Sequence, residues 1–135
     1  MRVLALDYGS ARCGCALSDP TGTLATPLGL VARPATRRGL DRVAALVVEH
    51  DVGKVVVGLP LSLSGGDSEQ TRETRDFAAR LAERLGEQVA VELYDERFTT
   101  KLAARAGPGA RATEDSRAAA HLLEGWLARD REGVE

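Results

Sequence analysis

The sequence predicts an α/β fold in a single domain spanning residues 1–135, with a five-stranded mixed sheet and helices on both of its faces. The amino-terminal part holds three strand-like segments joined by tight turns, which predicts an antiparallel meander. Two later apolar segments each follow a helical pattern, which predicts two further strands in parallel pairing. A length of 135 residues, 44% hydrophobic and 28% charged, is ordinary for one globular domain.

The meander is expected to begin with residues 2–7, RVLALD, a short apolar run that closes on an acid. Residues 8–12, YGSAR, then predict a turn into a second strand at 13–19, and GTLATPLGLV at 22–31 predicts the third. Cys13 and Cys15 would lie on one face, about 6.6 Å apart along the strand, which is near the upper limit for a disulfide. We therefore expect buried, reduced thiols rather than a zinc site.

Alternating helices and strands are expected after the meander. Apolar residues recur at helical spacing in residues 36–51, and the β-branched run KVVVGLP at 54–60 is typical of a strand buried on both faces. A second helix is expected in 67–85, stopped by Gly86, and a fifth strand in 88–95. The remainder predicts a short helix near Thr99, a loop, and a final helix with an apolar stripe formed by Ala118, Ala119, Leu122, Leu123, Trp126 and Leu127.

Composition and charge exclude some classes of function. The formal net charge of −2 means that no global basic field attracts polyanions, so binding of a nucleic acid would need a local patch. We find no apolar run of the roughly 20 residues that a membrane span needs, and the amino terminus lacks the pattern of a signal peptide. A cytoplasmic protein is expected.

Acidic residues gather where the predicted parallel strands end. Asp7 closes the first strand and Asp95-Glu96 the fifth, and Thr113 is a candidate N-cap that would place Glu114 and Asp115 in the first turn of the final helix. Ligands of such sheets collect at the carboxyl ends of the strands. Crowded carboxylates repel one another unless a cation lies between them, and hard ions such as Mg²⁺ or Mn²⁺ prefer such oxygen ligands.

Asp7, Glu96 and Asp115 are therefore candidates for a metal site that hydrolyses phosphodiesters, with Asp95 as a further ligand or its support. Arg97 and Lys101 would contact substrate phosphates. The alternative is that these acids are solvated and structural, with Thr99 or Thr100 only capping a helix. Residue chemistry alone leaves both interpretations open.

Two glycine-containing stretches could bind a phosphate group. The turn at 8–12 could place Ser10, backbone amides and Arg12 near an anion, although such a turn is common. Gly65 and Gly66 precede a predicted helix, whose amino end favours anions, although the same stretch could be a simple connection. Trp126 is expected in the core.

Four blocks of the sequence resemble those of one family, in order and at compatible distances. They are LALDYGSARCGCALSD, VVVGLPLSLSGG, DERFTT and EDSRAAAHLLEGWL. They resemble the YqgF (RuvX) family of Holliday-junction-resolvase-like pre-16S rRNA nucleases over nearly the whole chain. The resemblance implies an RNase H-like fold, divalent-metal-dependent cleavage of structured nucleic acid and maturation of the 5′ end of 16S rRNA in ribosome biogenesis.

The resemblance also implies roles for individual residues. Asp7, Glu96 and Asp115 take the catalytic positions, whereas supporting or substrate-binding positions fall on Arg12, Arg97, Thr99 and Thr100. Glu114 stands where a valine is common in the family, so it is an additional candidate ligand.

Three other functions remain as alternatives. A Holliday junction resolvase would act on four-way DNA as a dimer. A non-catalytic RNase H-like module would bind nucleic acid without metal. A nucleotide-binding fragment of the actin and sugar-kinase type shares the Asp-x-Gly opening, but 135 residues leave no second lobe to close over ATP. The leading prediction is a metal-dependent ribonuclease, as a monomer or homodimer.

Overall fold

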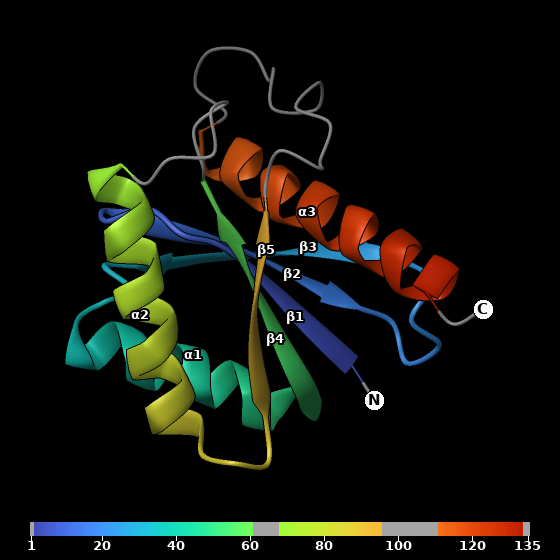
Figure 1. The fold of residues 1–135 in the computed structure, drawn as a ribbon, viewed down its shortest axis with the longest axis horizontal. Helices are drawn as coiled ribbons and strands as arrows, with labels where there is room; N and C mark the ends of the chain where they lie inside the picture. The colour runs from blue at the N-terminus through green and yellow to red at the C-terminus, as the bar shows by residue number, and fades with distance from the viewer. Residues whose placement is uncertain (1, 61–67, 96–110, 134–135) are drawn as a thin grey trace.

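The structure, a computed structural model, describes residues 2–60, 68–95 and 111–133, and within the last stretch the side chains of 116–129 (Figure 1). The elements follow in the order β1 (Arg2–Asp7), β2 (Arg12–Ser18), β3 (Ala25–Ala32), α1 (Arg37–Glu49), β4 (Val52–Leu59), α2 (Glu69–Leu85), β5 (Ala90–Asp95) and α3 (Arg111–Gly133).

The strands form one five-stranded sheet in the order β3-β2-β1-β4-β5. β1, β2 and β3 pair antiparallel, whereas β4 lies parallel to both β1 and β5. The predicted mixed sheet is therefore confirmed. The chain reverses direction at tight turns in the meander, and the connecting helices α1 and α2 return it to the start of each parallel strand.

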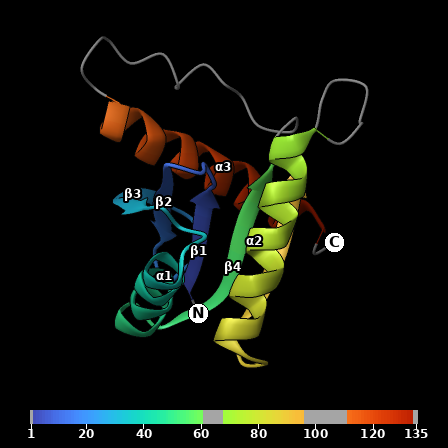
Figure 2. The ribbon, with the colours of Figure 1, turned by 90° about the vertical axis from the view of Figure 1, so that its left-hand side faces the viewer.

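Helices cover both faces of the sheet, as expected (Figures 1 and 2). α1 and α2 lie on one face, over a core that includes Leu4, Leu6, Val57 and Phe77. α3 crosses the other face, over smaller residues such as Ala5 and Ala16. Because side chains alternate between the faces of a strand, even-numbered residues of β1 face α1 and α2, and odd-numbered ones face α3.

Caps set the ends of the first two helices. The side chain of Thr36 accepts a hydrogen bond from the Gly39 amide at the start of α1, and that of Ser68 accepts one from the Thr71 amide at the start of α2. Gly86 ends α2 with a φ of 81°, a conformation that favours glycine. The predicted stop at Gly86 is thus confirmed.

The start of the final helix differs from the prediction. α3 begins at Arg111, so Thr113 lies inside the helix and is not its N-cap. Glu114 lies at the end of the first turn, and Asp115 falls after it. Arg111 and Ala112 are good helix formers, so the helix begins two residues before the threonine. Its buried apolar stripe contains the predicted Ala119, Leu122, Leu123, Trp126 and Leu127. It also contains Ala120, which is 7% exposed, whereas the predicted Ala118 is half-buried. The short helix expected near Thr99 lies outside the described residues.

Two further expectations about side chains are confirmed. Cys13 and Cys15 are buried free thiols, and Trp126 is buried against the sheet. The Trp126 indole donates a hydrogen bond of 2.7 Å to Oε2 of Glu92, while the Lys54 ammonium lies 3.3 Å from Oε1 of the same carboxylate. His121 lies on α3 beside Glu124, with 3.7 Å between Nδ1 and Oε1.

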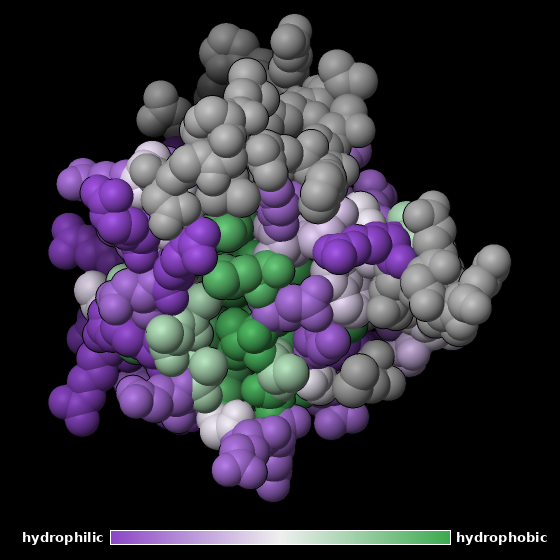
Figure 3. Space-filling view, viewed as in Figure 1, coloured by the Kyte–Doolittle hydropathy of each residue, from purple (hydrophilic) through white to green (hydrophobic). Residues whose placement is uncertain are grey.

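The face formed by β5 and α2 contains an apolar area surrounded by polar residues (Figure 3). β5 is an edge strand, where Leu93 is 37% exposed and Val91 is half-buried. None of the helices in the described ranges is both long enough and apolar enough to cross a bilayer.

Candidate active site at the carboxyl edge of the sheet

The three parallel strands end at one edge of the sheet, as the sequence pattern predicted. Leu6 pairs with Val57 and Val57 with Leu93, so β1, β4 and β5 are aligned. Asp7 is the last residue of β1, and Asp95, the last of β5, pairs with Leu59 at the end of β4. Two of the predicted acids therefore lie at the same edge.

Asp7 and Asp95 belong to different faces of the sheet. The neighbours Leu6 and Tyr8 lie in the core under α1 and α2, so alternation places Asp7 on the α3 side. Tyr94 belongs to the core under α3, so the next residue, Asp95, lies on the α2 side. Both residues make interactions with other parts of the protein.

The amino-terminal part of α3 is held against the end of β1. The Ser116 hydroxyl donates a 3.3 Å hydrogen bond to the carbonyl of Cys15 in β2. Cys15 pairs with Leu6, and the adjacent Gly14 pairs with Asp7. Asp115 precedes Ser116 in the helix, so the fold brings its backbone to the same face and the same end of the sheet as Asp7.

Most of the other predicted site residues belong to segments outside the described ranges. Glu96, Arg97, Thr99, Thr100 and Lys101 lie outside the described residues, as do Gly65 and Gly66, and the side chain of Asp115 is not described. Within the described ranges, no group of three histidine, cysteine, aspartate or glutamate residues is arranged to hold a metal ion. The three-acid metal site therefore stays a prediction.

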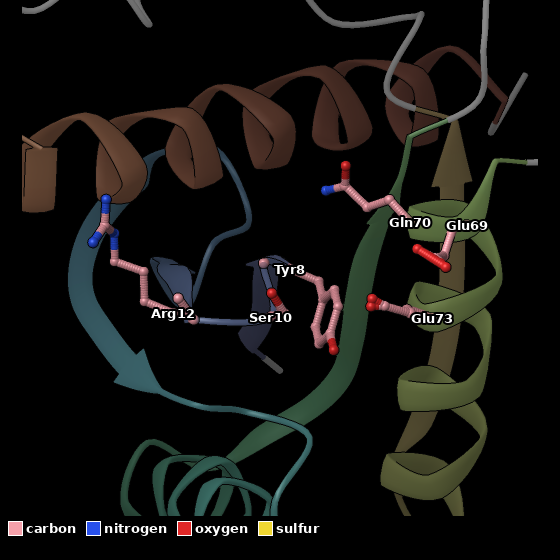
Figure 4. A pocket seen from close by; sticks show the side chains of 8 residues that line it. Tyr8, Ser10, Arg12, Glu69, Gln70 and Glu73 are labelled. Carbon is pink, nitrogen blue, oxygen red and sulfur yellow. The ribbon is translucent and has the colours of Figure 1, made fainter.

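A cavity of about 610 Å³ lies between the β1–β2 turn and the first turns of α2 (Figure 4). Its lining consists of Tyr8, Gly9, Ser10, Ala11, Arg12, Glu69, Gln70 and Glu73. Ser10 and Arg12, both predicted near a bound group, are among them. The three α2 residues were not predicted as site residues, because only the tertiary packing brings this helix next to the turn.

The turn itself requires glycine at position 9. A β carbon there would lie 2.7 Å from the carbonyl oxygen of Arg12, closer than real contacts allow. The turn is also tied to β3, because the Arg33 amide donates a 3.0 Å hydrogen bond to the carbonyl of Ala11. Arg12, which makes interactions of its own, points away from the three α2 side chains in Figure 4.

Tyr8 forms an inner wall of the cavity. Tyr8 is only 7% exposed, and its ring stacks on Phe77 of α2 with 4.7 Å between ring centroids. Burial raises the pKa of the Tyr8 hydroxyl, and the negative charge of Glu73 raises it further. Tyr8 is therefore neutral over the physiological range and links the strand that carries Asp7 to α2.

Comparison with known proteins identifies relatives over nearly the whole chain. A family model described as “RuvX: Holliday junction resolvase” matches residues 1–129. A protein of Thermobifida fusca named “Putative pre-16S rRNA nuclease” is 43% identical over 145 residues, covering 95% of this chain and 87% of its own. A protein of Anaeromyxobacter with the same name is 42% identical, covering 94% of this chain and 96% of its own.

Among solved structures, RuvC of T. thermophilus in complex with a Holliday junction substrate aligns with a TM-score of 0.58 at 18% identity, covering 96% of each chain. A second structure, of Thermus thermophilus RuvC, aligns with a TM-score of 0.55, covering 97% of each chain. These likenesses show an RNase H-like fold, which confirms the fold class that the sequence resemblance implied.

Proposed function

Because the chain belongs to the RuvX (YqgF) family, we propose that it is a divalent-metal-dependent nuclease of structured RNA that matures the 5′ end of pre-16S rRNA in ribosome biogenesis. The names of its relatives at above 40% identity support a nuclease acting on this precursor. We further propose that residues 1–135 form one catalytic domain and that it works in the cytoplasm.

One observation carries the catalytic site. The Ser116 hydrogen bond to Cys15 holds the amino-terminal part of α3 over the end of β1, on the face to which Asp7 belongs. This arrangement supports a site in which Asp7, Glu96 and Asp115 act together. Asp95 belongs to the opposite face, so we assign it a supporting role rather than a shared ligand position with Asp7.

The donor set fits Mg²⁺ or Mn²⁺, because the proposed ligands are carboxylates and no soft ligand takes part. Such an ion, when bound, activates a water molecule and stabilises the leaving oxygen of the phosphodiester. The carboxylates of Asp7, Glu96 and Asp115 would hold it. Arg12, Arg97, Thr99, Thr100 and Lys101 would bind and orient the substrate phosphates, with the arginines suited to paired hydrogen bonds.

Substitution of Asp7 tests this function. We expect Asp7→Asn to reduce Mg²⁺- or Mn²⁺-dependent cleavage of a pre-16S rRNA fragment at least about 100-fold, because a ligand carboxylate is lost while the side-chain volume is kept. Asp41→Asn, an exposed residue of α1, is the matched control and should retain activity. Asp95→Asn should have an intermediate effect. Equal rates of cleavage by wild type and Asp7→Asn would contradict the proposed site.

A second candidate function is resolution of four-way DNA junctions, which the description of the matching family model favours. Symmetric cleavage of a junction needs two active sites related by a dimer axis. Sedimentation of the protein with a four-way junction, together with a cleavage assay on the same DNA, separates the two candidates. A monomer that cleaves precursor RNA but leaves the junction intact would exclude the resolvase. Metal-independent RNA binding, unchanged by Glu96→Gln, would instead indicate a non-catalytic module.

A further inference from the structure

Positive charge gathers in the part of the chain that runs from the β1–β2 turn to the start of α1. Residues 8–40 contain one acid, Asp19, and four basic residues, Arg12, Arg33, Arg37 and Arg38. Asp19 follows the last residue of β2, whereas Arg12 is the first, so the acid lies at the opposite edge of the sheet. Because the whole chain has a formal net charge of −2, this excess of positive charge is a local feature.

The fold brings these arginines to the carboxyl edge of the sheet, next to the β1–β2 turn. Arg12 pairs with Ala32, the last residue of β3. Arg33 follows directly, and its amide donates a 3.0 Å hydrogen bond to the carbonyl of Ala11 in the turn. Three exposed arginines, which we call the basic corner, continue from Arg12 into the first turn of α1. They are Arg33, Arg37 and Arg38.

The backbone of the basic corner is held by short-range contacts. The Arg33 carbonyl accepts hydrogen bonds from the amide and the hydroxyl of Thr36, at 3.1 and 2.7 Å. Gly39 packs against the same carbonyl, where a β carbon would come within 2.2 Å of the oxygen. The three side chains therefore extend from a fixed backbone, which reduces the entropy that is lost when they bind a partner.

The charges of the basic corner are not neutralised within the described part of the chain, where none of its three arginines forms an ion pair. Asp41, the next acid in the sequence, pairs instead with Arg84, with 3.1 Å between Oδ1 and Nε.

The positions of these arginines are also unfavourable for the fold. The first turn of α1 holds no acid, and the helix dipole disfavours cations at that end. Arg33 has a φ of 43°, which is uncommon for a residue other than glycine. Arginine at these positions therefore does not stabilise the folded state, which indicates a role in binding an anionic partner.

We propose that the basic corner binds the phosphodiester backbone of the RNA substrate, where the RNA continues past the β1–β2 turn from the cleavage site. The proposal rests on the proposed function, because it takes the substrate to be RNA that is cleaved at the carboxyl edge. Guanidinium groups donate paired hydrogen bonds to phosphate oxygens. Three neighbouring cations match the repeated charges of a nucleic-acid backbone better than they match a single small anion.

Binding measurements without turnover test the basic corner. Wild type and variants would be titrated, in EDTA, into a fluorescein-labelled RNA hairpin with a single-stranded 5′ tail, and the anisotropy recorded at several KCl concentrations. We expect Arg37→Gln combined with Arg38→Gln to raise the dissociation constant about tenfold. The slope of log Kd against log[KCl] should fall by about 1.5, because each phosphate contact contributes roughly 0.7–0.9 to it.

Arg2→Gln is the control for the loss of positive charge. Arg2 begins β1, at the opposite edge of the sheet from the basic corner. Its substitution should change the dissociation constant by less than about twofold.

Melting temperatures separate a role in binding from a structural role. Arg33→Gly should weaken binding severalfold, yet it should melt no lower than wild type because glycine favours a positive φ. The double variant of Arg37 and Arg38 should also melt no lower, since it removes cations from the amino end of a helix.

Four results would each overturn the proposal: no binding of the hairpin by wild type, an unchanged dissociation constant in the double variant, an equal loss in Arg2→Gln, or lower melting temperatures in both basic-corner variants. The nuclease assignment is judged separately, by the loss of metal-dependent cleavage in Asp7→Asn. Either proposal can therefore fail without the other.

Discussion

At the edge of the sheet, the backbone around a single residue of the candidate site excludes any larger side chain. Gly9 lies in the β1–β2 turn, where a β carbon would come within 2.7 Å of the Arg12 carbonyl oxygen. The β carbon would clash with a backbone atom, so the turn itself would have to move. The rearrangement of a flexible side chain could not relieve the clash.

We therefore predict that Gly9→Ala lowers the free energy of unfolding by about 1–3 kcal/mol, a range typical of overpacked sites. Urea denaturation followed by circular dichroism measures the change. Ser10→Ala, at an exposed position of the same turn, is the control and should stay within about 0.5 kcal/mol of wild type. A stable Gly9→Ala protein would mean that the turn can adjust.

Asp19 organises the turn between β2 and β3. Its carboxylate accepts hydrogen bonds from the amides of Thr23 and Leu24, at 2.8 and 3.0 Å, and from the Thr21 hydroxyl. These bonds favour the ionised form, led by that from Leu24, and they hold the pKa of Asp19 well below its ordinary value of 3.8. A depressed pKa in the folded state means that the ionised carboxylate stabilises the fold.

This stabilisation should be present in full above about pH 4, which is the pKa of an aspartate in an unfolded chain. It should be lost as the pH falls toward the lower pKa that Asp19 has in the folded protein. We predict that Asp19→Asn melts at a lower temperature than wild type at pH 6 and that the difference shrinks as the pH is lowered toward 2. Thermal melts at several pH values, with exposed Asp41→Asn as the comparison, measure it. A difference independent of pH would contradict the role of the charge.

At the scale of elements, α2 is joined to the sheet by one buried threonine. The fully buried hydroxyl of Thr71 donates a 2.7 Å hydrogen bond to the carbonyl of Pro60, just after β4. Thr74, equally buried on the same helix, donates instead to the carbonyl of Gln70 within α2. The two threonines are therefore a matched pair that differs in which element receives the bond.

We predict that Thr71→Val lowers the free energy of unfolding by about 1–3 kcal/mol, because the Pro60 carbonyl loses its partner from α2. Thr74→Val should cost less than about 1 kcal/mol, since the Gln70 carbonyl keeps its helical N–H donor. Urea titrations of both variants give the comparison. Equal losses would show that the link between α2 and β4 contributes little.

Elements were the level at which sequence patterns were most informative. Apolar alternation and β-branched runs predicted all five strands, and helical spacing with a glycine stop predicted α2 to its last turn. These patterns depend on residues that are close in the chain, so they can be recognised without knowledge of the fold. The start of α3 was wrong because Thr113 has cap chemistry but the helix formers before it continue the helix.

At the scale of the whole molecule, the proposed site predicts a link between metal and stability. An ion that binds only the folded state stabilises it by mass action, by about 2.7 kcal/mol at 100 times its dissociation constant. We predict that Mn²⁺ raises the melting temperature of wild type by several degrees.

Mn²⁺ should raise the melting temperature of Asp7→Asn much less than that of wild type. Chelation with EDTA should return the melting temperature of wild type to its value without metal. Differential scanning fluorimetry measures each case. An equal shift in the melting temperatures of both proteins would mean that the ion binds at another site.

Short-range periodicity and turn chemistry were enough to predict the five strands, the mixed sheet and the positions of Asp7 and Asp95 at strand ends. The tertiary structure was needed to show that the two acids belong to opposite faces, that Ser116 holds α3 over the end of β1, and that Glu73 and Tyr8 line one cavity. Strand register and helix packing depend on contacts between residues far apart in the chain, and no local pattern encodes which of these residues meet.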